Sequence, residues 1–186
     1  MAYLVIATED HARALYCVLR AADRAEIEAR TSKDPLSVLL SYAQYNCGVR
    51  LFSEMMFSDA GELVGMCGVN PVVKFQPGEV PFPDGGGTPT GEASVWMIGS
   101  TLLDEKPIEF LRSSLDWVED LKRIYHTLTN TVDGRNTKRI EWLRWLDFTM
   151  DPTPSPDSPP GIPFYSFTWT RKKDTEECAL HPLSPP

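Results

Sequence analysis

Basic and aromatic side chains alternate between positions 135 and 145, where the chain shows its most obvious chemistry. The cations and tryptophans of this stretch are Arg135, Lys138, Arg139, Trp142, Arg144 and Trp145. Such a mixture is typical of nucleic-acid binding, of a protein interface, and of a solvated helix face on which arginine stems cover tryptophan rings. The net charge of −8 opposes general nucleic-acid binding, because the field of an acidic protein repels phosphate. We therefore expect a solvated face. The candidate contacts for a protein partner on it are Arg139, Trp142, Arg144 and Trp145.

Cysteine and histidine give no sign of a metal site. The four cysteines are widely spaced, at Cys17, Cys47, Cys67 and Cys178, and the chain has three histidines. Without a C-x-x-C pair there is no ligand set for zinc, so we expect no metal and reduced thiols in a cytoplasmic protein. His126 could act as a base, but its place at the end of a predicted helix favours a contact with the helix dipole.

The composition indicates one folded domain. With 186 residues and 42% hydrophobic content, the chain can bury one good core, and two cores would both be thin. We expect this domain to cover residues 1–171. No run of about 18 apolar residues is present, and the apolar start is too short for a secretory signal, so no membrane association is expected.

Hydrophobic periodicity predicts alternating strands and helices. The predicted strands lie at 3–7, 50–57, 63–69, 94–99, 128–132, from 148, and 164–171. The first predicted helix begins at the cap Thr8 and continues to Ala22, and the second begins at Asp34. A long helix starts at Pro107, and a shorter one is capped by Asn136 or Thr137.

Three segments are too rich in proline, glycine and polar residues to form a core. They are a long loop at 71–92, a proline-rich loop at 151–163 and a C-terminal tail at 172–186. We expect the tail to be extended and to become ordered on a partner subunit, with Leu180 and Leu183 as its apolar contacts.

The order of these elements resembles the GNAT (N-acetyltransferase) superfamily. The sequence LTNTVDGRNTKRIEWLRWLDF at 128–148 is similar to the GNAT segment in which a strand ends in Asn, a helix follows, and Leu-Gly-Phe opens the next strand. Asp147 stands here in place of the glycine. The resemblance implies an α/β fold with a mixed central sheet flanked by helices.

Several shorter motifs are similar to one group of proteins within that superfamily, the internal virion proteins and acetyltransferase-like proteins of short-tailed phages. The motifs are AADRAE at 21–26, GVNP at 68–71, FLR at 110–112 and the segment 136–148. This resemblance implies a structural or assembly protein inside the phage particle or at its head-tail junction. Its partners would be other virion proteins and copies of itself. It would be found in the virion, and in the host cytoplasm during assembly.

The superfamily resemblance also implies where an acetyl-CoA site would lie. Asn130, Asn136 and Tyr125 would be the candidates for a catalytic contact, although Asn136 also suits a plain helix cap. The loop after the central strand would face the pyrophosphate, with Ser100, Thr101 and Lys106 as candidates for binding it. This loop, GSTLLDEKP at 99–107, lacks the expected glycines and carries two acids that repel phosphate. We therefore expect a catalytically degenerate scaffold without a cofactor, and the alternative is an active acetyl-CoA-dependent N-acyltransferase.

Overall fold

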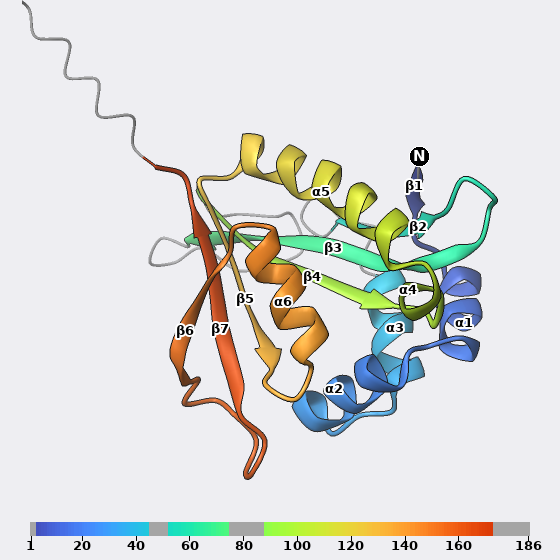
Figure 1. Ribbon diagram of the computed structural model, residues 1–186, viewed down its shortest axis with the longest axis horizontal. Coiled ribbons are helices and arrows are strands. Elements are labelled where there is room, and N and C mark those ends of the chain that lie inside the picture. Colours follow the sequence, from blue (N-terminus) through green and yellow to red (C-terminus); the bar gives the residue numbers. More distant parts are fainter. Residues whose placement is uncertain (1–2, 45–51, 75–87, 173–186) are drawn as a thin grey trace, which may run out of the picture.

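The computed structural model describes residues 3–44, 52–74 and 88–172. Its strands form one seven-stranded sheet in the order β1-β2-β3-β4-β5-β7-β6 (Figure 1). The strands are β1 (Tyr3–Ile6), β2 (Phe52–Phe57), β3 (Leu63–Lys74), β4 (Thr88–Gly99), β5 (Thr127–Asp133), β6 (Thr149–Pro154) and β7 (Phe164–Thr170). The helices are α1 (Glu9–Cys17), α2 (Ala21–Thr31), α3 (Pro35–Gln44), α4 (Leu102–Glu105), α5 (Pro107–Ile124) and α6 (Thr137–Trp145).

Helices cover both faces of this sheet (Figure 1). The long helix α5 lies on one face, where it buries Trp117, Val118 and Leu121 against the strands. Helices α1, α2 and α3 lie on the other face and bury a second apolar cluster that includes Leu15 and Leu39. The expectation of a mixed α/β sheet flanked by helices is confirmed. Among the described helices, none combines the length and apolar character that crossing a bilayer requires.

Strands β4 and β5 form the parallel pair of the sheet, and they separate soon after they meet. They pair from Glu92 with Thr127 to Ser94 with Thr129, whereas the other neighbours run antiparallel. Beyond Ser94 both strands continue, but no longer side by side. This leaves a wedge-shaped opening in the middle of the sheet, which we call the β4–β5 opening.

The single helix predicted from Thr8 to Ala22 is two helices, α1 and α2, because the chain between them pairs with the end of β4. Leu19 forms a β-bridge with Ser100, and the Arg20 N–H donates to the Gly99 carbonyl at 3.1 Å. These bonds satisfy main-chain groups that a continuous helix would otherwise use. They also place the start of α2 beside the β4–β5 opening.

Other predicted boundaries differ from the structure as well. Strands β3 and β4 both extend into the predicted loop at 71–92, and β6 includes the first residues of the predicted loop at 151–163. In the tail, Leu180 and Leu183 lie outside the described residues. Asp147 has a φ of 68°, the left-handed conformation that favours glycine, so the backbone here has the shape that a glycine would adopt most easily.

Candidate functional site

Two adjoining cavities lie at the β4–β5 opening. The larger has a volume of about 410 Å³ and is lined by residues of α4, α5 and α6, including Leu103, Phe110 and Trp145. The smaller, of about 130 Å³, is lined by residues of α2 and α3 and also by residues of α5 and α6. It therefore reaches through the sheet from one helical layer to the other. Met97, Arg139 and Trp142 line both cavities.

Strand β4 presents main-chain groups to this opening. The Val95 carbonyl faces β5 and accepts a hydrogen bond from Nδ2 of Asn130 at 3.0 Å, and the Gly99 carbonyl accepts one from the Arg20 N–H on the same edge. Because alternate residues of a strand point their main-chain groups to the same side, the N–H and C=O of Met97 face the same way. They lie beyond the last residue pair of β4 and β5, Ser94 with Thr129.

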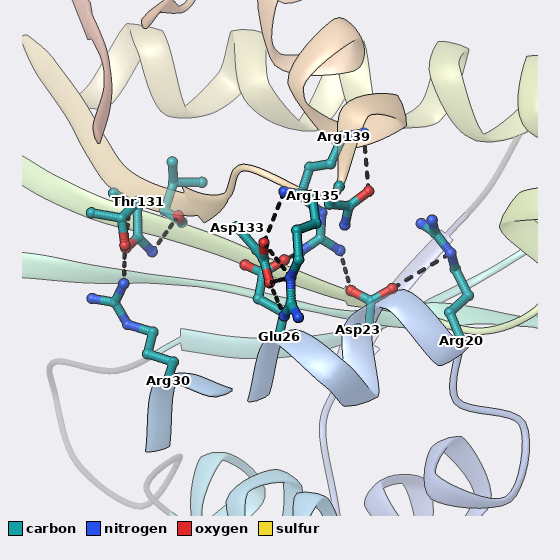
Figure 2. Close-up of polar contacts among 11 residues, drawn as sticks. Arg20, Asp23, Glu26, Arg30, Thr131, Asp133, Arg135 and Arg139 are labelled. Atoms are coloured by element: carbon teal, nitrogen blue, oxygen red, sulfur yellow. Dashed lines mark hydrogen bonds and ion pairs between the residues drawn. The ribbon is translucent and has the colours of Figure 1, made fainter. Parts of the chain in front are cut away.

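An ionic network connects α2 with α6 across the opening (Figure 2). Arg139 of α6 donates to Asp23 and, at 3.3 Å, to Glu26, both from α2. Asp23 is 1% exposed and also lies 3.5 Å from the Arg20 guanidinium, which in turn pairs with Asp104 at 3.2 Å. A buried carboxylate is stable only with a cation nearby, and here the carboxylates lie on α2 and the cation Arg139 lies on α6. The network therefore holds the two helices at a fixed separation.

Glu26 is the member of this network best suited to proton transfer. Burial raises the pKa of its carboxyl, and Arg139 opposes that rise. The side-chain nitrogen of Asn136 lies close enough to lower the same pKa, yet it makes no hydrogen bond to a described residue. A carboxylate with a raised pKa beside a cavity is a more effective base near neutral pH than an ordinary one.

One turn further along α2, Arg30 lines the smaller cavity together with Tyr42. Its guanidinium donates to Oγ1 of Thr131 and lies 5.5 Å from the centre of the Phe164 ring. Tyr42 stacks on Trp96 with 4.4 Å between ring centres. Burial raises the pKa of the Tyr42 hydroxyl, and Arg30 partly offsets this. The cavity therefore has an aromatic wall and a cation at its α2–α3 end.

The asparagine candidates have structural partners. Asn130 uses both ends of its amide, donating to the Val95 carbonyl and accepting from the Thr131 N–H at 2.8 Å, so it braces the point where β4 and β5 separate. Asn136 caps α6, accepting a hydrogen bond from the Arg139 N–H. Asn130 thus lines the smaller cavity. Asn136 does not line it, but it caps α6, the helix that contributes Arg139, Trp142 and Leu143 to the lining.

The candidates near the end of α5 lie away from both cavities. Tyr125 follows α5 and packs half-buried against the core, where burial raises the pKa of its hydroxyl. The Nε2 of His126 lies 2.8 Å from the Thr90 carbonyl, and its main-chain N–H donates to Gly91. His126 thus holds the start of β5 against β4, whereas the Tyr125 N–H donates to Leu121 at the end of α5, and neither residue lines either cavity.

The loop predicted to face a pyrophosphate uses its amides internally. The N–H of Ser100 donates to Val64, and that of Thr101 donates to Val18. The Ser100 hydroxyl is also engaged, with the Leu63 carbonyl, and the Lys106 ammonium pairs with Glu62 at 2.5 Å. The N–H groups of Leu103, Asp104 and Lys106 bond within the loop. The loop therefore lacks the ring of outward amides that an anion site needs.

The basic and aromatic stretch proves to be divided between the interior and the surface. Arg139 is inside the ionic network, and Trp142 donates from Nε1 to Oγ of Ser114 at 3.0 Å. Trp145 is 52% exposed at the rim of the larger cavity, and Arg144 is exposed. The stretch therefore lines this protein's own cavities as well as its surface. Within the described ranges, no group of histidine, cysteine and acidic side chains could hold a metal ion.

Sequence reasoning missed Asp23, Glu26 and Arg30, which belong to the site. A signal for them exists, since spacings of three and four place these residues on one face of a helix, next to the apolar Ile27. Charged residues on a helix are mostly solvated, however, so this spacing groups the three residues without placing them inside the fold.

Comparisons with known proteins place the fold. No protein-family model and no curated protein sequence matches the chain. A ribosomal-protein-alanine N-acetyltransferase from Brucella melitensis has 14% identity and a TM-score of 0.59, over 90% of this chain and 99% of that one. The ribosomal-protein-S18-alanine N-acetyltransferase from Escherichia coli has 14% identity and a TM-score of 0.56, over 95% and 98%. A ribosomal L7/L12 α-N-protein acetyltransferase in complex with coenzyme A has 12% identity and a TM-score of 0.63, over 91% and 94%.

These similarities overturn the expectation of a structural protein in a phage particle. The three solved structures just described are N-acetyltransferases, and this chain matches them over nearly their whole length. The prediction of a virion protein on a degenerate scaffold is therefore wrong. The expected absence of a cofactor has no support either, because one of these enzymes is seen with coenzyme A. The chain has the fold of the GNAT N-acetyltransferases.

Proposed function

We propose that this protein is an N-acyltransferase that moves an acyl group from a CoA thioester to an amine. The observation that carries the proposal is the smaller cavity, which passes through the sheet at the β4–β5 opening. A donor on the α5–α6 side and an acceptor on the α2–α3 side can meet there at Met97. The coenzyme A complex of a fold relative supports the choice of donor.

The donor side fits an extended chain that carries amide groups. Such a chain can add to a free strand edge by main-chain hydrogen bonds, and the N–H and C=O of Met97 are available for them. The larger cavity, with Phe110 and Trp142 in its walls, gives room for the arm beside apolar side chains. A coenzyme A arm has this chemistry and supplies the activated acyl group as a thioester.

The phosphate end of the donor finds a poorer site. The cations at the larger cavity are Arg20, Lys138 and Arg139. Arg20 and Lys138 both pair with Asp104, and Arg139 pairs with the acids of α2. A phosphate would have to compete with Asp104 for these cations. We therefore expect the arm to contribute more to donor affinity than the phosphates do.

The residues on the acceptor side can carry out the proton transfer. The amine must lose a proton before its nitrogen bonds to the acyl carbon, and Glu26 is a buried carboxylate that can take it. The nitrogen is positively charged once it has bonded to the acyl carbon; as the C–S bond breaks, it releases a second proton, which the departing sulfur takes up to leave as a thiol. A main-chain N–H of β4 that faces the opening can stabilise the negative charge on the acyl oxygen.

Calorimetry with acetyl-CoA, followed by a thiol-release assay with a panel of amines, tests the proposal. We expect binding, and transfer that Glu26→Gln lowers by about 100-fold or more while acetyl-CoA still binds. Glu28→Gln is the matched control, since Glu28 lies on the same helix but is exposed. Absence of heat at millimolar acetyl-CoA, or full activity of Glu26→Gln, would contradict this mechanism.

A further inference from the structure

The acceptor side of the smaller cavity has a negative and a positive end. Glu26 and Arg30 are four residues apart on α2, so they share one face of the helix and lie roughly 6 Å apart along its axis. Both line the cavity. Glu26 is nearly buried, with its side chain 14% exposed, whereas Arg30 is exposed at the mouth.

Arg30 differs from the other arginines at the two cavities. Arg139 and Arg20 are each held by carboxylates. Within the described residues Arg30 is paired with no carboxylate, and its recorded polar partner is the neutral hydroxyl of Thr131. That bond uses one of the five N–H donors of a guanidinium. The planar group therefore keeps donors for a bidentate contact with an anion.

The surroundings hold the Arg30 guanidinium in place. It lies over the Phe164 ring on one side and bonds to Thr131 of β5 on another, so it is anchored to the sheet. Tyr42 completes this end of the cavity with a hydroxyl, and its ring is fixed by stacking on Trp96. An arginine so anchored loses little freedom when it binds an anion, which favours specific recognition over a loose surface contact.

We infer that the acyl acceptor is a small amino carboxylic acid whose amine lies at Glu26 and whose carboxylate binds Arg30. This inference rests on the proposed function, and it names the substrate class. The smaller cavity, of about 130 Å³, lies against both side chains and gives the acceptor its room. An amine without a carboxylate gains nothing from Arg30, and a polyamine is repelled by it.

The test compares acceptors that differ in the carboxylate alone. Glycine, β-alanine and 4-aminobutyrate are assayed with acetyl-CoA beside their primary amides, in the wild type, Arg30→Gln and Lys33→Gln. Lys33 is an exposed cation just beyond α2, so its substitution makes the same charge change outside the cavity. We expect the acid that fits best to exceed its amide in kcat/KM by about 10-fold or more, mostly through KM. Arg30→Gln should abolish this preference, and Lys33→Gln should keep it.

Two outcomes separate this inference from the proposed function. If acids and amides are acylated equally well, or if Arg30→Gln keeps the preference, the inference is wrong and the N-acyltransferase proposal stands. If acetyl-CoA does not bind and no amine is acylated, the proposed function fails. Calorimetric titration of the same acids without acetyl-CoA then still tests whether they bind at Arg30. Binding should be seen in the wild type and should be at least 10-fold weaker in Arg30→Gln.

Discussion

Replacing Arg139 with methionine is the sharpest test of the ionic network between α2 and α6. Arg139 bonds to Asp23 and Glu26, and its own side chain is 12% exposed. Methionine keeps most of the aliphatic stem and removes the charge. The variant therefore leaves two buried carboxylates facing a position without a cation.

The size of the effect follows from what remains around Asp23. Removal of one partner from a buried ion pair costs about 3–5 kcal/mol, because the other charge stays buried and unpaired. Asp23 keeps Arg20 at 3.5 Å, which is a weaker substitute. We therefore expect Arg139→Met to lower the free energy of unfolding by about 3 kcal/mol, the low end of that range.

The pH dependence of this loss identifies its cause. Burial raises the pKa of Glu26 and Arg139 lowers it, so the variant should raise that pKa further. A carboxyl with a higher pKa in the folded than in the unfolded state weakens the fold when ionised, and it regains stability as the pH falls through its folded pKa. The deficit of Arg139→Met should thus be smaller at about pH 5 than at about pH 8.

Urea denaturation at these two pH values gives both quantities. Arg144→Met is the control, because Arg144 lies on the same helix but is exposed, and it should change stability by about 0.5 kcal/mol or less. If Arg139→Met is as stable as this control, or loses more stability at the lower pH, the network does not hold α2 and α6 together in the way described.

Three further predictions concern separate features of the structure. Asp104→Asn should free the two cations that Asp104 engages and tighten acetyl-CoA binding by on the order of 1 kcal/mol, about fivefold in calorimetry, and unchanged affinity would place the phosphates elsewhere. Asp147→Gly should stabilise the fold by about 0.5–1 kcal/mol in thermal unfolding, since φ is 68° there, and a lower melting temperature would contradict it. Alkylation followed by peptide mass spectrometry should modify exposed Cys17 in the native protein but not Cys67, because burial raises the pKa of the Cys67 thiol, and rapid labelling of Cys67 would refute its burial.

The elements that follow a clear apolar period could be predicted from the sequence. Val118 and Leu121 are buried on α5 as their spacing indicates, and the cap at Asn136 is present. The break between α1 and α2 could not be predicted, because the helical pattern continues through Leu19. What ends the helix is a pairing with Ser100, and that contact is about 80 residues away along the chain.

The ionic network was hidden for a similar reason. Charged residues such as Asp23 and Glu26 on a helix are mostly solvated, so composition gives no reason to place them inside. Their partner Arg139 is 116 positions from Asp23 and 113 from Glu26. This separation along the chain explains why Arg139 was expected on the surface. The lack of an anion-binding loop at 99–107, in contrast, could be predicted from the missing glycines of that segment.

The position of β7 in the sheet has a consequence for how the protein reaches its native state. This strand is the last in sequence among the described residues, yet it lies between β5 and β6 rather than at an edge. Until β7 arrives, β5 has its neighbour β4 along three residue pairs alone, from Glu92 with Thr127 to Ser94 with Thr129. Such non-local pairing favours slow folding, because a long loop must close before its contacts form. An incomplete chain that lacks β7 would therefore expose the β5 edge, and it would be a ready target for chaperones and proteases.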